Sequence, residues 1–346
     1  MRIAQVAPLF ESVPPTGYGG TERVVSFLTE ALVALGHDVT LFATADSRTE
    51  ARLVPCAPHA LRRELSREEA LAPHLRMVRE VADREAEFDV IHAHIDHLPY
   101  AVARRSRTPW ITTLHGRLDL PELVPVYREF REQRVVAISE SQRAQLPWLS
   151  WVGVVHHGIP RDLYRLHETA GEHLAFVGRI SREKRVDRAV EIAVRAGRRL
   201  RIAAKIDDAD RAYYERVKPL LEHPLVEFVG ELGDAEKDEF LGGAAALLFP
   251  IDWPEPFGLI MVEALACGTP VIAWRHGSVD EVLIDGKTGF LCDRTAEAVE
   301  AVFRLDRIDR VACRQDFEER FVAERMARQY IEIFEAALRE GRDGGA

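Results

Sequence analysis

The chain has 346 residues, of which 47% are hydrophobic and 29% charged, and this composition excludes a disordered or collagen-like protein. At about 150 residues per domain, the length predicts two domains. The formal net charge of -10 excludes a broad surface for nonspecific nucleic-acid binding, so we expect no nucleic-acid partner.

A glycine-rich loop follows the first predicted strand. The apolar run 3–7 gives way to a stretch rich in proline and glycine, and apolar residues then recur at helical spacing over 24–35. This pattern predicts a strand, a long loop and a helix. Gly19 and Gly20 stand at the start of the predicted helix, where backbone N–H groups can bind an anion. We expect both glycines to contact a phosphate; the alternative is that they only form a tight turn.

The rest of the first half alternates short apolar runs with polar or helix-prone stretches. The apolar runs lie at 39–43, 88–92, 110–114, 134–138 and 152–155. Their alternation predicts an α/β sheet domain over residues 1–165.

Three histidines and an aspartate form the run HAHIDH over 92–97, which is similar to the metal-ligand run of the metallo-β-lactamase fold. Because this run follows a strand inside a repeating βα pattern, we expect no metal there. Instead, we expect His94 to line a cleft at the carboxyl end of a strand and His92 to pack in the core. A zinc site is the alternative.

The apolar pattern lapses over 163–171, where we place the interdomain linker. Beyond it, strands are predicted near 174–178, 200–204, 225–229, 245–250 and 270–274, and helices near 184–196, 209–221, 235–243 and 258–267. This alternation predicts a second doubly wound α/β domain over 170–318. A long amphipathic helix is predicted after it, over about 320–340.

Cations cluster where the first helix of the second domain begins. Arg179 ends a predicted strand, and Lys184 closes the basic stretch that follows. Positive charge at a helix start opposes the helix dipole, which is easier to explain if an anion lies between the cations. We expect Arg179 and Lys184 to clamp a diphosphate; the alternative is a solvated basic loop.

Residues 253–270 are the most informative segment. Pro256 suits the first turn of a helix, and Gly258 lets a ligand approach the backbone. Glu263 is acidic within an otherwise apolar run, and a buried carboxylate there needs strong hydrogen-bond donors. Ribose hydroxyl groups would serve; backbone N–H groups of a neighbouring loop are the alternative.

The cysteines and the start of the chain indicate the compartment. The four cysteines are far apart and form no CxxC pair, so the sequence suggests neither a disulfide framework nor a cysteine zinc site. The first apolar run is too short for a signal peptide or a membrane span. We expect a cytoplasmic protein without an integral membrane segment; peripheral membrane contact and the oligomeric state stay open.

Three ordered motifs in the second half carry a family resemblance. They are GRISREK (178–184), EPFGLIMVEALACGTPVIA (255–273) and GSVDEVLIDGKTGFL (277–291). The second contains Glu255 and Glu263 as Glu-x7-Glu. With GYGGTERVV, TLHG and HHGI in the first half, the chain resembles the family 4 retaining glycosyltransferases of GT-B fold over nearly its whole length. Arg185 departs from the family pattern, which has glycine after the lysine.

The resemblance implies an α/β GT-B architecture of two doubly wound Rossmann-like domains that face each other across a cleft. Residues 1–165 would form the acceptor-side domain and 170–318 the nucleotide-sugar-binding domain. The helix over about 320–340 would cross back onto the first domain; packing wholly on the second domain is the alternative.

The resemblance also implies site residues. The donor-binding residues would be Gly19, Gly20, Arg179, Lys184, Val229, Gly230, Glu231, Phe257, Gly258, Leu259 and Glu263. Within this set, Arg179 and Lys184 would hold the diphosphate and Glu263 the ribose, while the loop 229–231 would meet the base. His115, beside the reacting sugar, and Glu255, facing it, are the expected catalytic residues.

The implied reaction is transfer of a hexosyl unit from a nucleotide sugar, with a UDP-sugar expected, to a small-molecule or glycan acceptor that the sequence does not identify. Two cations and helix N–H groups can neutralise a diphosphate leaving group, so we expect no metal and no cofactor besides the nucleotide-sugar co-substrate. Configuration would be retained if the departing phosphate oxygen takes the acceptor's proton on the same face. A carboxylate or His94 as base or nucleophile is the alternative.

Other functions stay open on the sequence. The main alternative is a UDP-sugar epimerase of related two-domain fold. A two-domain NAD oxidoreductase lacks a GxGxxG run after the first strand, and a non-catalytic sugar-nucleotide sensor would not need both acids and His115.

Overall fold

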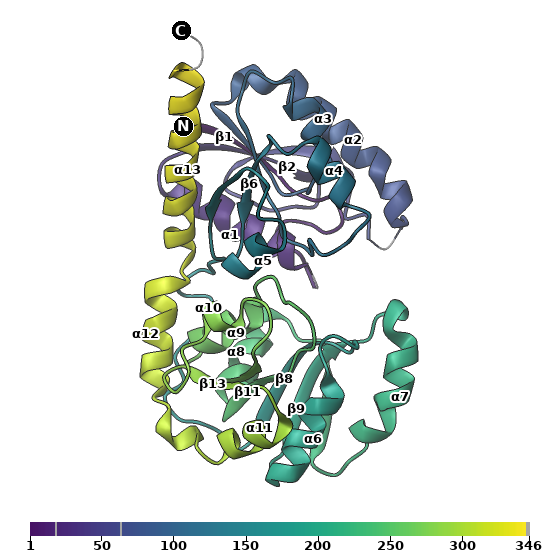
Figure 1. Cartoon of the computed structure of the whole chain (residues 1–346), viewed down its shortest axis with the longest axis vertical. Helices are drawn as coiled ribbons and strands as arrows, with labels where there is room; N and C mark the ends of the chain where they lie inside the picture. The colour runs from purple at the N-terminus through teal and green to yellow at the C-terminus, as the bar shows by residue number, and fades with distance from the viewer. Residues whose placement is uncertain (18, 63, 344–346) are drawn as a thin grey trace. The chain divides into compact units, whose positions relative to one another are not determined.

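The computed structural model describes residues 1–17, 19–62 and 64–343. The chain forms two compact units, unit 1 (Met1–Pro160 with Ala323–Ala346) and unit 2 (Arg161–Val322). Each unit has one parallel sheet with helices around it (Figure 1). Residues 161–165, which we expected in the first domain, therefore belong to unit 2. No helix in the described ranges is long and apolar enough to cross a membrane.

Unit 1 contains a seven-stranded sheet in the order β3-β2-β1-β4-β5-β6-β7. Its strands are β1 (Arg2–Val6), β2 (Asp38–Thr44), β3 (Arg52–Ala57), β4 (Val90–Ala93), β5 (Trp110–Thr113), β6 (Arg134–Ala137) and β7 (Trp151–Val154). Its helices are α1 (Gly20–Ala34), α2 (Arg67–Asp83), α3 (Tyr100–Ala103), α4 (Val124–Glu129), α5 (Glu140–Gln145) and α13 (Ala323–Asp343), with a 3-10 turn, η1 (Glu85–Glu87).

The central strands of unit 1 are buried along their length, as expected for parallel strands covered on both faces. Strand β1 pairs with β2 on one side and with β4 on the other, so the strand order reverses between β1 and β4. In the register of β1 and β4, Gln5 lies opposite His92. This register places two polar side chains next to each other inside the sheet.

The long amphipathic helix α13 is part of unit 1, where it packs beside α1 (Figure 1). Its buried face carries Met326, Tyr330 and Phe334. The rings of Tyr330 and Phe334 lie 4.6 and 5.2 Å from the ring of His92 on β4. A helix from the end of the chain thus covers the centre of the first sheet.

Unit 2 contains a six-stranded sheet in the order β10-β9-β8-β11-β12-β13. Its strands are β8 (Leu174–Arg179), β9 (Leu200–Lys205), β10 (Val226–Gly230), β11 (Ala246–Phe249), β12 (Val271–Trp274) and β13 (Gly289–Cys292). Its helices are α6 (Val186–Ala196), α7 (Arg211–Leu221), α8 (Asp234–Gly242), α9 (Leu259–Ala266), α10 (Val279–Val282), α11 (Thr295–Val302) and α12 (Arg310–Arg320), with 3-10 turns η2 (Asp208–Asp210) and η3 (Leu305–Arg307).

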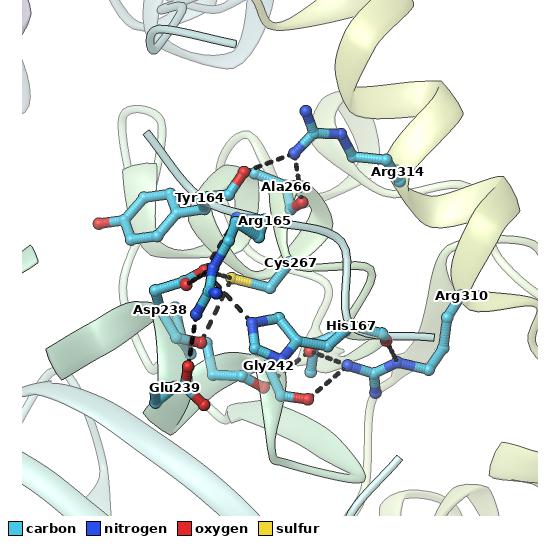
Figure 2. A network of polar contacts seen from close by, with 12 residues as sticks. Tyr164, Arg165, His167, Asp238, Glu239, Gly242, Ala266, Cys267, Arg310 and Arg314 are labelled. Atoms are coloured by element: carbon cyan, nitrogen blue, oxygen red, sulfur yellow. Dashed lines mark hydrogen bonds and ion pairs between the residues drawn. The ribbon is translucent and has the colours of Figure 1, made fainter. Parts of the chain in front are cut away.

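Two arginines of α12 fix the start of unit 2, the segment 161–168, onto its core (Figure 2). Arg310 donates to the carbonyl oxygens of residues 167, 242 and 244, the last two at 2.7 and 2.9 Å. Arg314 donates to the carbonyl oxygens of residues 164 and 266 at 2.7 and 2.8 Å. Residue 266 ends α9, so this guanidinium also satisfies a carbonyl group that a helix end leaves without an intrahelical partner. These contacts explain why the segment belongs to unit 2.

Candidate active site

The strand order of unit 2 reverses between β8 and β11, which are neighbours at the centre of the sheet. The loop 180–185 follows β8 and the loop 250–258 follows β11, so both loops lie at the carboxyl ends of these strands. Open α/β sheets bind ligands at such switch points. Five of the eleven expected donor-binding residues lie on these two loops or directly beside them: Arg179, Lys184, Phe257, Gly258 and Leu259.

An ion pair between Lys184 and Glu255 joins the two loops. Nε1 of Trp253 donates to the same carboxylate oxygen, Oε2 of Glu255, at 2.9 Å. Nζ of Lys184 lies 5.3 Å from the ring centroid of Trp253 and 5.5 Å from that of Phe249, within the range of cation–π attraction. The ammonium group is therefore held between a carboxylate and two aromatic rings.

Arg179, the last residue of β8, is also paired with protein carboxylates. It forms an ion pair with Glu183, and its Nε lies 2.8 Å from Oδ2 of Asp210. From the sequence we expected Arg179 and Lys184 to pair with an external anion, but acidic side chains of unit 2 already pair with both. A diphosphate at this site would compete with those carboxylates.

Arg185, which replaces the glycine of the family pattern, keeps a backbone conformation that glycine favours. It has φ 54° and ψ 53°, the left-handed region, at the start of α6. Its guanidinium group forms ion pairs with Asp187 and Asp252, each at 2.9 Å. These two contacts hold a conformation that costs a non-glycine residue about 1–2 kcal/mol.

The loop after β11 ends at Gly258, which caps α9 with a φ of 80°. This positive φ favours glycine, and a Cβ atom there would also lie 2.8 Å from the Cε atom of Met261 and 3.2 Å from the ring of Phe249. The N–H group of Met261 bonds to the carbonyl oxygen of Gly258. Within the described residues, the N–H groups of Leu259 and Ile260 have no acceptor. The start of α9 thus offers N–H groups to an anion.

Glu263 is buried on α9, with 4% of its surface exposed. Its Oε2 accepts a hydrogen bond from Nζ of Lys237 on α8 at 2.9 Å, and the same ammonium group lies 3.1 Å from Oδ1 of Asp234. The sequence predicted that this carboxylate needs a strong donor, but missed Lys237. Lys237 lies in a charged stretch, and no sequence spacing links it to a residue on another helix.

The expected base-binding residues Val229, Gly230 and Glu231 lie at the carboxyl end of β10, the edge strand. The pairing of β10 with β9 shifts register between Phe228 and Gly230, and Gly230 has a φ of 81°. Glu231 is exposed. The structure places these residues at the same end of the sheet as Arg179, two strands away.

In unit 1, His115 lies just after β5, is itself partly buried, and contacts a group of buried imidazoles. We call His92, His94, His115 and His157 the histidine cluster. Nδ1 of His94 lies 2.8 Å from Nε2 of His115, whose ring stacks on that of His157 at 5.2 Å. Burial lowers the pKa of all four, that of His115 to about 3. The cluster is therefore neutral.

His94 corrects one expectation. It is only 2% exposed, and its two ring nitrogens bond to His115 and to Oε1 of Gln5, the latter at 2.8 Å. Its polar atoms thus point into unit 1 rather than lining a cleft. His92 is fully buried, as expected for a core residue, and its Nε2 lies 2.7 Å from the hydroxyl oxygen of Thr113.

The expected phosphate-binding glycines lie at the start of α1. Gly20 is its first residue, and Gly19 precedes it. A Cβ atom on Gly19 would lie 2.9 Å from Cβ of Pro15, whereas one on Gly20 would meet nothing within 4 Å. Gly19 is therefore required by packing against the loop, while Gly20 leaves open space beside the helix start.

The run over 92–97 does not gather metal ligands. In the part of the chain that the structure describes, one group brings three potential ligand atoms together: His167, Asp238 and Glu239. Arg165 forms ion pairs with both of these carboxylates (Figure 2), with Nε 2.8 Å from Oδ2 of Asp238. A guanidinium group thus occupies the position that a cation would need, and the group belongs to the contacts that fix the segment 161–168.

Comparison with known proteins assigns both halves of the chain. Residues 18–163 match the model for Glycosyltransferase Family 4, and residues 166–317 match that for Glycosyl transferases group 1. The chain is 27% identical to a glycogen synthase of Mycobacterium tuberculosis, over 96% of this chain and 94% of that protein. It is also 27% identical to a phosphatidyl-myo-inositol mannosyltransferase of Mycobacterium leprae, over 99% and 98%.

Solved structures share the fold along the whole chain. A sucrose-phosphate synthase from Thermosynechococcus elongatus superposes with a TM-score of 0.79 at 21% identity, covering 97% of this chain and 98% of that one. Anabaena Alr3699/HepE in complex with UDP-glucose gives a TM-score of 0.74 at 16% identity, covering 97% and 100%. The two sheets therefore form the architecture that the sequence predicted.

Proposed function

We propose that this chain, which belongs to the family 4 glycosyltransferases of GT-B fold, is a retaining enzyme that transfers a hexosyl unit from a UDP-sugar to an acceptor hydroxyl group. The observation that carries the proposal is the meeting of Lys184, Glu255 and the start of α9 at the switch point of unit 2. A structural neighbour, Alr3699/HepE, binds UDP-glucose, which supports the choice of donor. The names of the relatives include a glycogen synthase and a lipid mannosyltransferase, so they favour no single acceptor.

Donor binding would exchange partners at the two loops. The diphosphate would take Lys184 from Glu255 and Arg179 from Glu183, and its oxygens would accept hydrogen bonds from the first N–H groups of α9. Glu263, oriented by Lys237, would accept hydrogen bonds from the ribose hydroxyl groups. In this account the carboxylates that hold the cations in place are also the ones that the donor displaces.

The partner exchange would free Glu255 for the sugar. As the bond between the anomeric carbon and the diphosphate oxygen breaks, positive charge develops on the sugar ring and negative charge on the diphosphate. Glu255 would stabilise the first and Lys184 the second, both more strongly than in the ground state. The acceptor oxygen would bond to the anomeric carbon on the face that the diphosphate leaves, and its proton would pass to the departing diphosphate oxygen, which retains the configuration.

A panel of nucleotide sugars tests this proposal. UDP-, GDP- and ADP-linked hexoses are incubated with the protein, with and without candidate acceptors, and free nucleotide is measured. We expect release of UDP from a UDP-sugar, faster with acceptor, and NMR of the product should show the anomeric configuration of the donor. Release of GDP or ADP only would overturn the choice of donor, and an inverted product would overturn retention. Conversion of a UDP-sugar into its epimer without release of nucleotide would indicate an epimerase instead.

A further inference from the structure

A continuous line of buried side chains runs from β1 to His115 in unit 1. Gln5, at the centre of β1, is fully buried and lies between two imidazoles of the histidine cluster. Its Nε2 lies 3.3 Å from Nδ1 of His92, and its Oε1 lies 2.8 Å from Nε2 of His94. His94 in turn reaches Nε2 of His115 through its Nδ1 at 2.8 Å. Every atom in this line can therefore be assigned as donor or acceptor.

The side-chain amide of Gln5 sets the direction of each hydrogen bond. An amide oxygen only accepts, so Nε2 of His94 carries a proton and donates to Oε1 of Gln5. A neutral imidazole has one N–H group, so Nδ1 of His94 is an acceptor and Nε2 of His115 donates to it. His115 then has no proton left for its Nδ1. Nδ1 of His115 can therefore act only as a hydrogen-bond acceptor, through its lone pair.

The other orientation of the amide would reverse all of these bonds, because amide nitrogen and oxygen exchange places. Two distances favour the orientation described. The contact of Oε1 with His94 is 2.8 Å, a normal N–H···O length, while that of Nε2 with Nδ1 of His92 is 3.3 Å. The other ring nitrogen of His92 bonds to the hydroxyl group of Thr113, which bonds to that of Tyr330 at 2.8 Å. Each hydroxyl group can donate or accept, so these two contacts are compatible with either orientation of the amide.

Nδ1 of His115 is buried and has no hydrogen-bond partner among the described residues. Burial lowers the pKa of this imidazole to about 3, so at neutral pH Nδ1 keeps its lone pair and needs a donor. A buried acceptor of this kind favours a ligand that brings an O–H group. A carboxylate and the diphosphate of a nucleotide sugar bring no such proton at neutral pH, whereas sugars bring several hydroxyl groups.

We propose that Gln5 and His94 are positioning residues that fix His115 in the tautomer with Nε2 protonated, so that its Nδ1 accepts a hydrogen bond from a substrate hydroxyl group. The tautomer follows from unit 1 alone. The identity of the ligand, a hydroxyl group of the donor sugar or of the acceptor, rests on the proposed function.

NMR of 15N-histidine-labelled protein tests the tautomer directly. The signals of His115 are identified by their loss in His115→Asn. In the wild type we expect a protonated Nε2 and a bare Nδ1 at neutral pH; a protonated Nδ1 would overturn the proposal. Gln5→Met, of similar size but with no polar group, should give a mixture of tautomers. Tyr330→Phe is the matched control, because it removes one hydroxyl group from the far end of the same network and should leave His115 unchanged.

Steady-state kinetics of the same variants tests which substrate hydroxyl group His115 binds. Gln5→Met should lower kcat/KM about tenfold while UDP, which has no sugar to transfer, binds as to the wild type. A raised KM for the donor would assign the hydroxyl group to the donor sugar, and a raised KM for the acceptor would assign it to the acceptor. If His115 shows the expected tautomer but Gln5→Met is as active as Tyr330→Phe, the proposed role in binding is wrong while the tautomer stands. If Gln5→Met leaves the tautomer unchanged, the positioning role is wrong.

Discussion

At the scale of single residues, Arg179, Lys184, Glu255 and Glu263 each have a partner of opposite charge within unit 2. Glu255 and Lys184 hold each other at the ends of β8 and β11, and Glu263 is held by Lys237. The two acids belong to one motif, but their surroundings differ. Glu255 lies on a loop with an indole N–H group as second partner, whereas Glu263 lies in the apolar interior of α9. Neutralising each of these two acids should therefore change the kinetics of transfer in a different way.

Glu263→Gln should raise the KM for the donor more than it lowers kcat, because the ribose does not react and its contacts are the same in the ground and transition states. Glu255→Gln should lower kcat with little change in KM, because its contact strengthens as positive charge develops on the sugar. Steady-state kinetics with the donor varied at saturating acceptor measures both, after circular dichroism has shown that the variants fold. The opposite pattern, or two variants that behave alike, would contradict this division of roles.

The buried pair of Lys237 and Glu263 should also matter for stability. Lys237→Met leaves a carboxylate buried without its partner and should lower the free energy of unfolding by about 3–5 kcal/mol. Combining it with Glu263→Met removes both charges and should recover most of the loss. Urea unfolding of the wild type, of Lys237→Met and of the double variant measures these free energies.

The control for this pair is Arg195→Met, which breaks the exposed ion pair with Glu191 on α6. Because both of these side chains are half exposed, the expected cost is below about 1 kcal/mol. A cost for Lys237→Met no greater than that of this control would contradict the account.

At the scale of elements, the sequence predicted the strands that the sheets bury and missed two strands at their edges. β3 and β13 each pair on one side only, and the apolar run in each is short, RLVPCA being interrupted by proline and GFLC holding three apolar side chains. β3 contains Pro55, which argues against a central strand, and β13 begins at Gly289. Their positions depend on pairing with a neighbouring strand, which local sequence does not encode.

The close approach between the segment 161–168 and α8 could likewise not be predicted from the sequence. A Cβ atom on Gly242, the last residue of α8, would overlap the ring of His167. Gly242→Ala should therefore displace the segment and lower the free energy of unfolding by about 1–3 kcal/mol. The measurement is chemical denaturation.

The matched control lies at the other end of the same helix. Gly233 precedes α8, and a Cβ atom there would meet only Oε2 of Glu236, at 3.6 Å. Gly233→Ala should therefore lower the free energy of unfolding by less than about 1 kcal/mol, the cost of replacing glycine by alanine at an N-cap. Equal effects of the two substitutions would show that the contact with His167 does not require glycine at 242.

At the scale of the whole molecule, the two α/β sheets and the family were predictable because regular alternation and three ordered motifs are properties of local sequence. The boundary at Pro160 and the pairing of Lys237 with Glu263 were not, because both depend on contacts between residues far apart in the chain. The histidine cluster shows the same limit. For the run over 92–97 we expected His92 in the core and no metal, with a zinc site as the alternative. The contacts that join His92 and His94 through Gln5 depend on the register of β1 and β4, which the sequence does not show.

The proposed leaving-group stabilisation by cations and helix N–H groups implies that transfer needs no metal ion. Activity should survive excess EDTA, because Lys184, Arg179 and the start of α9 supply the positive charge that a divalent ion supplies elsewhere. The assay is transfer before and after chelation, with manganese or magnesium added back. Loss of activity that a metal restores would contradict metal independence and would make the run of His92, His94, Asp96 and His97 a candidate metal site.

We propose that the switch point of unit 2 binds the diphosphate of the donor. Calorimetric titration with UDP in the presence of EDTA measures this binding directly. The wild type should bind UDP at one site. Lys184→Ala should bind about ten- to a hundredfold more weakly, because it loses a charge-assisted contact of about 1.5–3 kcal/mol. Lys218→Ala, which removes an exposed lysine near the end of α7, the helix that leads into the amino end of β10, is the control and should bind nearly as tightly as the wild type. Binding of UDP to Lys184→Ala with wild-type affinity would contradict the account.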